Sequence, residues 1–137
     1  MFYFIRHGQT DYSEQNIKIY QDFGVNLANL SETGIQQIKQ TAKNPRLKDA
    51  DLILSSPYTR VLQTAAILLK ELNIEIKIET DLHECLANKT YHYETAKKAF
   101  RKYPSQTQKP WENALSIKNR VLNALNRYTG DKSSRTF

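Results

Sequence analysis

A histidine beside an arginine near the start of the chain could attack phosphorus. His7 follows Arg6, and nearby positive charge disfavours the imidazolium, so we expect His7 to stay neutral near neutral pH with a free lone pair. A neutral imidazole next to guanidinium suits attack on a phosphoryl group, because the arginine neutralises oxygens that would otherwise repel the nucleophile. Gly8 removes a side chain where a substrate must come close.

Two residues further along the chain could complete this chemistry. Arg60 falls in the first turn of a predicted helix, so its charge adds to the positive end of the helix dipole and favours an anion. Glu84 could protonate the departing oxygen and later activate water. Together with His7 they predict covalent catalysis through a phosphohistidine. Each also has an ordinary structural interpretation, since an arginine in a first helical turn is usually a surface group.

Other chemistries have less support in the sequence. His7, His83 and His92 show no metal-ligand spacing, and the chain contains no HExxH, paired CxxC, Walker loop or GxGxxG. The single cysteine, Cys85, excludes an internal disulfide. We therefore expect neither a metal nor a cofactor.

Hydrophobic patterning predicts the elements that must position these residues. The expected strands are 2–5 and 52–54, both buried, and 74–79, half-exposed because isoleucines alternate with charged residues. Four helices are expected. The first two begin after the N-caps Ser31 and Ser56, the latter with Pro57 at its first position. The other two cover residues 93–103 and 114–128.

Alternation of strands and helices predicts an α/β fold with a largely parallel sheet, in a single domain covering residues 1–137. Ligands bind outside the carboxyl ends of such strands. Arg6–Gly8, Ser55–Arg60 and Asp81–Glu84 each follow an expected strand, so we expect these segments to face the same edge of the sheet.

The bulk composition limits the partners and the location. The formal net charge is +6, which favours anionic ligands, but no basic motif interleaved with aromatics suggests nucleic-acid binding. No apolar run approaches the ~20 residues that span a bilayer, and the start of the chain does not resemble a signal peptide. We expect a cytoplasmic enzyme that binds neither nucleic acid nor membrane.

Several stretches of the chain resemble the histidine phosphatase superfamily, the phosphoglycerate-mutase-like proteins. They are Arg6-His7-Gly8-Gln9-Thr10, Leu30–Gln37, Ser55-Ser56-Pro57-Tyr58-Thr59-Arg60-Val61-Leu62-Gln63-Thr64-Ala65, Asp81–Glu84, and Trp111–Glu112 with Arg120–Val121. An RHG triplet alone is a weak signal, but with the SSPxxRxxQTA block at this distance it is strong. The resemblance implies a three-layer α/β/α sandwich with a mostly parallel sheet.

The same resemblance implies roles for individual residues. His7 would be the nucleophile, Arg6 and Arg60 would hold the phosphate, and Glu84 would donate the proton. Thr10 would lie close to the phosphate pocket, and the family uses no metal. The implied activity is that of a phosphatase acting on a small phosphorylated metabolite. A phosphoglycerate-mutase-type transferase is the less favoured alternative, because such members tend to be longer.

Two positions depart from the family pattern. Ser13 stands where the family often has asparagine, which affects one expected phosphate contact. The family also carries a second histidine on a strand after the helix that here ends near Tyr128, and this sequence has none there. We therefore expect a domain that is incomplete at its C-terminus and lacks the last central strand, and that is either marginally stable or dimerises through the unpaired edge. A catalytically impaired phosphate-binding relic or fragment is the alternative interpretation.

Overall fold

The computed structural model describes residues 1–13, 27–84 and 113–129. The chain divides into two compact units, Met1–Thr80 and Asp81–Phe137. The expected helix over 93–103 and the pair Trp111–Glu112 lie outside the described residues. No helix in the described ranges combines the length and apolar character needed to cross a membrane.

The helix α1 (Glu32–Ala42) begins where the sequence predicts. Ser31 is its N-cap, and the Ser31 hydroxyl accepts a hydrogen bond from the amide of Gly34 at 3.1 Å. Ile38 and Ala42 fall on one stripe of the helix and are buried. The predicted helix start and its apolar face are therefore confirmed.

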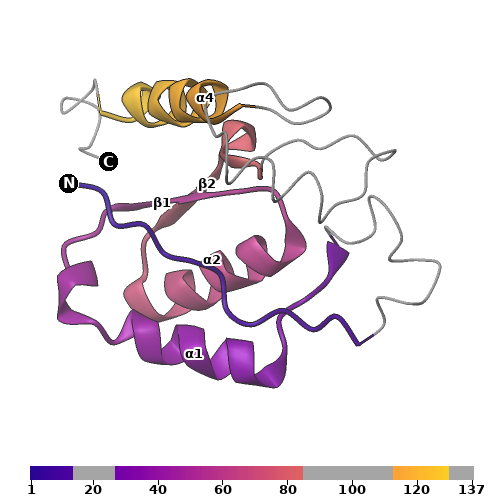
Figure 1. The fold of residues 1–137 in the computed structure, drawn as a ribbon. Helices are drawn as coiled ribbons and strands as arrows, with labels where there is room; N and C mark the ends of the chain where they lie inside the picture. The colour runs from indigo at the N-terminus through magenta and orange to yellow at the C-terminus, as the bar shows by residue number, and fades with distance from the viewer. Residues whose placement is uncertain (14–26, 85–112, 130–137) are drawn as a thin grey trace. The chain divides into compact units, whose positions relative to one another are not determined.

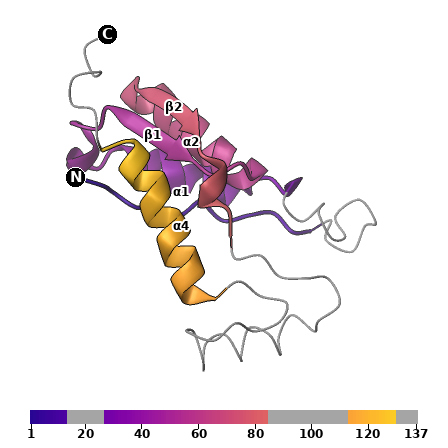
Figure 2. The same ribbon diagram turned by 90° about the horizontal axis from the view of Figure 1, so that it is seen from above.

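A parallel strand pair joined by a helix forms the centre of the first unit. Strand β1 (Leu52–Ser55) pairs in parallel with β2 (Glu75–Ile78), and Ile53 faces Ile76 in the register. The two strands lie side by side in Figure 2. Helix α2 (Thr59–Leu72) connects them, as a parallel pair requires. The predicted α/β fold with a parallel sheet is confirmed.

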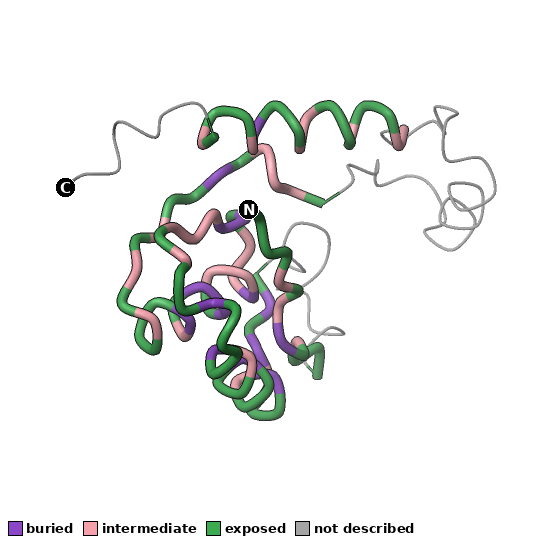
Figure 3. The backbone as a smooth tube through the Cα atoms, turned by 90° about the vertical axis from the view of Figure 1, so that its left-hand side faces the viewer, coloured by how far each residue is buried: buried purple, intermediate pink, exposed green. Residues whose placement is uncertain are grey.

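The core of the first unit lies between the helices and the strands. Helix α1 packs against α2, and α2 packs against both β1 and β2, below which the two helices lie in Figure 1. The buried side chains are Ile38, Ala42, Leu47 from the short 3-10 helix η3 (Pro45–Leu47), and Leu68. Figure 3 colours the buried stretches of the backbone purple. Each large aliphatic side chain buried in this way stabilises the fold by about 1.5–3 kcal/mol.

The expected buried strand at residues 2–5 is wrong. These residues have no strand pairing, and Phe4 is 78% exposed. Only Ile5 packs against the core. A strand needs a neighbour to accept and donate its main-chain hydrogen bonds, and within the described residues β1 pairs with β2 alone. An apolar run predicts burial but cannot supply that neighbour.

The start of α2 also differs from the prediction. The helix begins at Thr59, and its N-cap is Tyr58 rather than Ser56. The Tyr58 backbone is extended (φ −74°, ψ 142°), so Ser56 and Pro57 belong to the preceding turn. The later start still leaves Arg60 in the first turn of the helix, as the sequence predicts, so its charge adds to the positive end of the helix dipole.

Within the second unit, helix α4 (Ala114–Arg127) confirms the prediction for 114–128. Asn113 caps it by accepting a hydrogen bond from the amide of Ser116 at 2.8 Å. Ala124 is its buried residue, and most of the helix is exposed (Figure 3). The one-turn 3-10 helix η4 (Thr80–Leu82) starts the segment that leads to Glu84.

Candidate active site

The imidazole of His7 is held at both of its ring nitrogens. Nε2 accepts a hydrogen bond from Nε of Arg60 at 3.3 Å, and Nδ1 lies 2.7 Å from the carbonyl oxygen of Gly8. An arginine Nε–H can only donate and a carbonyl can only accept. The ring proton therefore sits on Nδ1, and Nε2 carries the lone pair. This is the neutral imidazole that phosphorus attack needs.

Arg60 reaches His7 across 53 residues of sequence. It lies in the first turn of α2 and is only 3% exposed. Its guanidinium carbon sits 4.8 Å from the centre of the Tyr58 ring, a cation–π arrangement that orients the side chain. A positive charge removed from water in this way acts strongly on a nearby anion. The structure thus brings His7 into contact with an arginine from the segment that follows strand β1.

Thr64 ties the histidine loop to the arginine helix. Its hydroxyl accepts a hydrogen bond from the amide of Gly8 at 3.3 Å and donates one to the carbonyl of Arg60 at 2.9 Å. The hydroxyl thus both accepts and donates a hydrogen bond, and Thr64 is 4% exposed. Thr64 lies within the SSPxxRxxQTA block, but the sequence pattern predicts no role for it. Its position one helical turn after Arg60 was the available signal.

Two glycines allow the histidine loop to lie directly against α1. A Cβ on Gly8 would meet the carbonyl oxygen of Gly34 and lie 2.8 Å from its carbonyl carbon. A Cβ on Gly34 would meet the carbonyl oxygen of Gln9 and lie 2.8 Å from its amide nitrogen. Neither glycine has a positive φ, so space is the requirement and not backbone conformation. The structure thus gives Gly8 a packing role against α1, where the sequence suggested room for substrate.

Two glutamine side chains fix the rest of this loop. The amide of Gln9 donates to Oε1 of Gln37 at 2.9 Å, and the amide of Leu30 donates to Oε1 of Gln63 at 2.7 Å. Leu30 forms an antiparallel bridge with Thr10. The side-chain oxygens therefore supply the partners that the loop backbone would lack outside a regular sheet.

Thr10 lies next to the histidine, and its place at a phosphate pocket stays a prediction. Its Oγ1 is 3.5 Å from Nδ1 of His7. Ser13 is engaged elsewhere: its amide donates to Oδ1 of Asp11 at 2.8 Å. Hydrogen bonds from the hydroxyl and then the amide of Ser13 lower the pKa of Asp11, because they stabilise the carboxylate. In this structure Ser13 therefore contacts an anionic group of the chain itself.

Arg6 is not part of the contact between His7 and Arg60. Its side chain is exposed, and it makes no hydrogen bond or ion pair with any residue in the described ranges. Its role in holding phosphate stays a prediction.

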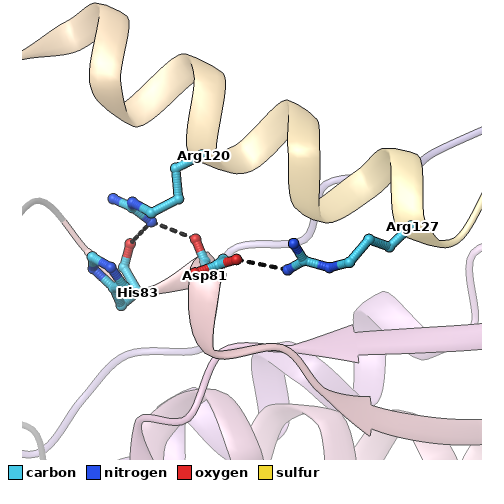
Figure 4. Close-up of polar contacts among 4 residues, drawn as sticks. All are labelled: Asp81, His83, Arg120 and Arg127. Atoms are coloured by element: carbon cyan, nitrogen blue, oxygen red, sulfur yellow. Dashed lines mark hydrogen bonds and ion pairs between the residues drawn. The ribbon is translucent and has the colours of Figure 1, made fainter.

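The acidic segment Asp81–Glu84 belongs to the second unit. Nη1 of Arg120 donates to the carbonyl oxygens of Asp81 and His83, the latter at 3.1 Å (Figure 4). Nη2 of Arg127 binds the Asp81 carboxylate at 2.7 Å. Glu84 itself is exposed. Its action on a substrate held at His7 stays a prediction.

Comparison with known proteins gives a family match over almost the whole chain. The model of the histidine phosphatase superfamily (branch 1) matches residues 2–136. No curated protein sequence is significantly similar to the chain.

Solved structures share the fold at low sequence identity. The chain is similar to mycobacterial hydrolase 1 with a TM-score of 0.71 and 21% identity, over 93% of this chain and 64% of that one. It is similar to mycobacterial glucosyl-3-phosphoglycerate phosphatase, solved with VO3, with a TM-score of 0.67 and 22% identity, over 95% and 68%. For Bacillus stearothermophilus YhfR the TM-score is 0.62 and the identity 21%, over 91% and 67%. The chain thus spans roughly two-thirds of the length of each of these proteins.

Proposed function

Since the chain belongs to the histidine phosphatase superfamily, branch 1, we propose that it hydrolyses phosphate monoesters through a phosphohistidine at His7. One observation supports this most directly. Nε2 of His7 carries a lone pair and lies 3.3 Å from Nε of a buried arginine, Arg60. A nucleophile and the cation that would neutralise its anionic target are therefore in contact before any substrate arrives.

The first step forms a phosphorus–nitrogen bond and breaks the ester bond. The lone pair on Nε2 of His7 attacks phosphorus, and the electrons of the ester bond leave with the alcohol oxygen. Glu84, in its carboxylic acid form, gives that oxygen a proton and becomes a carboxylate. The imidazole gains positive charge as the new bond forms. The Gly8 carbonyl, 2.7 Å from Nδ1, stabilises that charge.

The second step returns the enzyme to its starting state. The Glu84 carboxylate removes a proton from water as the water oxygen attacks phosphorus. The phosphorus–nitrogen bond breaks, its electrons return to Nε2 of His7, and inorganic phosphate leaves. Arg60 and Arg6 bind phosphoryl oxygens in both steps, as the family resemblance implies. Gly8, Thr10 and Ser13 are the further phosphate contacts that we propose.

A small phosphorylated metabolite is the proposed substrate class. The mycobacterial phosphatase of similar fold is named for a phosphoglycerate ester, which supports a soluble metabolite over other phosphorylated ligands.

The test is hydrolysis of an aryl phosphate, with a chelator present, by the chain and by His7→Ala. We expect the mutant to lose turnover by roughly a thousandfold or more, because the covalent route is removed. Arg46→Ala, at an exposed position of the 3-10 helix η3, should retain full turnover and controls for loss of a basic residue. Rapid quenching with a labelled substrate should trap an acid-labile, base-stable phosphoprotein that His7→Ala cannot form.

Three results would contradict the proposal. Turnover that survives in His7→Ala would exclude the phosphohistidine, and turnover that the chelator abolishes would exclude the metal-independent route. A folded chain that binds vanadate without hydrolysing any aryl phosphate would support the phosphate-binding relic instead.

A further inference from the structure

We infer that Arg120 is a positioning residue that sets the placement of Glu84, an inference that rests on the proposed role of Glu84 as the proton donor. All the contacts that carry it lie within the second unit. They involve the segment Asp81–Glu84 and one face of helix α4.

One guanidinium nitrogen of Arg120 holds two main-chain carbonyl groups of this segment, which lie two residues apart. Nη1 donates to the carbonyl oxygen of Asp81 and to that of His83, the latter at 3.1 Å (Figure 4). A terminal guanidinium nitrogen has two hydrogens, so it can serve both carbonyls at once. The rigid planar fork of arginine suits this task better than a lysine ammonium.

Arg127 provides a second attachment from the same face of α4. It lies seven residues, or about two helical turns, after Arg120, so both side chains project from one side of the helix. Its Nη2 binds the Asp81 carboxylate at 2.7 Å, with side chains 49% and 42% exposed. The exposed ion pair contributes little by itself, whereas the half-buried Arg120 acts on the main chain.

The peptide geometry carries the effect of Arg120 to Glu84. The carbonyl of His83 and the Cα of Glu84 belong to the same planar peptide group. Fixing that carbonyl therefore fixes the plane from which the Glu84 side chain projects. On the other side of Glu84, Nδ1 of His83 lies 2.6 Å from its carbonyl oxygen. The backbone is thus held before and after Glu84, while the side chain stays exposed for contact with a substrate.

The expected consequence is a defect confined to proton donation. A leaving group that departs readily as an anion needs no proton, whereas a poor leaving group does. Misplacing the acid should therefore slow hydrolysis of esters with poor leaving groups much more than esters with good ones. A residue that only stabilises the fold would lower the active fraction and slow both substrates equally.

The experiment compares phenyl phosphate with dinitrophenyl phosphate for wild type, Arg120→Met and Glu84→Gln. We expect Arg120→Met to lose roughly tenfold to a hundredfold on phenyl phosphate, part of what a general acid contributes. The rate on dinitrophenyl phosphate should stay within about threefold of wild type, since no proton is required there. Lys118→Met, which removes a positive charge from the exposed side of α4, should leave both rates unchanged.

Two comparisons keep the inference separate from the proposed function. Glu84→Gln should show the same selective loss, and to a larger extent. If Glu84→Gln slows hydrolysis of both substrates equally, or wild type hydrolyses neither, the proposed acid role of Glu84 is contradicted. The inference about Arg120 is then contradicted as well. If Glu84→Gln is selective and Arg120→Met is not, the inference alone is overturned. Arg120→Lys, which keeps a donor, should show a smaller selective loss, and its rate ratio remains measurable even if Arg120→Met folds poorly.

Discussion

Two short segments carry the candidate chemistry, and the chain holds them by different means. The loop around His7 in the first unit is fixed by uncharged groups: the Thr64 hydroxyl, the Gln37 side-chain amide and the backbone of Gly34. The segment Asp81–Glu84 in the second unit is fixed by two guanidinium groups. The loop that we propose to receive an anion already has Arg60 beside it. Neutral supports position that loop without adding a counter-ion that would compete for Arg60.

The two kinds of support should also differ in energy. Thr64 is buried, and a buried donor that loses its partner costs about 1–3 kcal/mol. The ion pair between Arg127 and Asp81 is about half exposed, and such pairs contribute about 0–1 kcal/mol and weaken in salt. Substitutions at Thr64 should therefore reduce the free energy of unfolding more than substitutions at Arg127. Their effect should not depend on ionic strength.

The largest effect on stability is expected for Gly34→Ala. The new methyl group would overlap the backbone of Gln9, so the loop carrying His7 and helix α1 must separate. Overpacking of this kind costs about 1–3 kcal/mol or more in the free energy of unfolding. Urea denaturation measures that loss, and hydrolysis of an aryl phosphate should fall with it.

The matched control for that substitution is Gln40→Ala on the exposed side of the same helix. Alanine is a better helix former than glutamine, so stability should be unchanged or slightly higher. A Gly34→Ala protein as stable as Gln40→Ala would show that the loop does not rest on α1 as described.

An intermediate effect is expected for Thr64→Val, which has nearly the same shape but no hydroxyl. The Gly8 amide would lose its partner, whereas the Arg60 carbonyl would keep its main-chain hydrogen bond within the helix, so we expect a loss of about 1–3 kcal/mol in unfolding free energy. Thr64→Ser keeps the hydroxyl and should retain more of the stability. If serine and valine were equally destabilising, packing of the methyl group would matter and the hydrogen bonds would not.

The smallest effect is expected for Arg127→Gln. Loss of the ion pair to Asp81 should reduce the unfolding free energy by no more than about 1 kcal/mol in low salt. Raising the ionic strength to roughly 1 M should remove most of that difference, because screening is then nearly complete. The difference between Thr64→Val and wild type should persist under the same salt. A salt-independent effect at Arg127 would contradict the contrast between the two segments.

The sequence predicted helices and strands correctly where a few neighbouring residues determine them. The Ser31 cap, the apolar face of α4 and the existence of strand β2 each depend on residues close together in the chain. The predicted alternation in β2 fails at its end, where Ile78 is 58% exposed and Glu79 is buried. The predicted strand at 2–5 failed because its hydrogen-bonding neighbour is not a property of the segment. The later start of α2 depends on the backbone conformation of Tyr58, which Ser56 and Pro57 do not reveal.

The candidate site was predictable only in part, for a similar reason. The position of Arg60 in a first helical turn suggested that its charge favours an anion there, and the structure adds the contact with His7. Thr64 was missed because its partner Gly8 lies 56 residues away. Arg120 was missed because an arginine on an amphipathic helix is usually a solvated side chain, and only the fold shows which carbonyls it meets.

The hydrogen bond from Arg60 to Nε2 of His7 has a chemical consequence for the resting protein. The nitrogen has one lone pair, so it can accept this hydrogen bond or form a covalent bond, but not both at once. We therefore expect Arg60 to slow the reaction of the imidazole with alkylating and acylating reagents that carry no negative charge. A bound oxyanion would draw the guanidinium toward its own oxygens and so uncover the nitrogen. Under the proposed mechanism, the compound that needs the nucleophile would also be the one that exposes it.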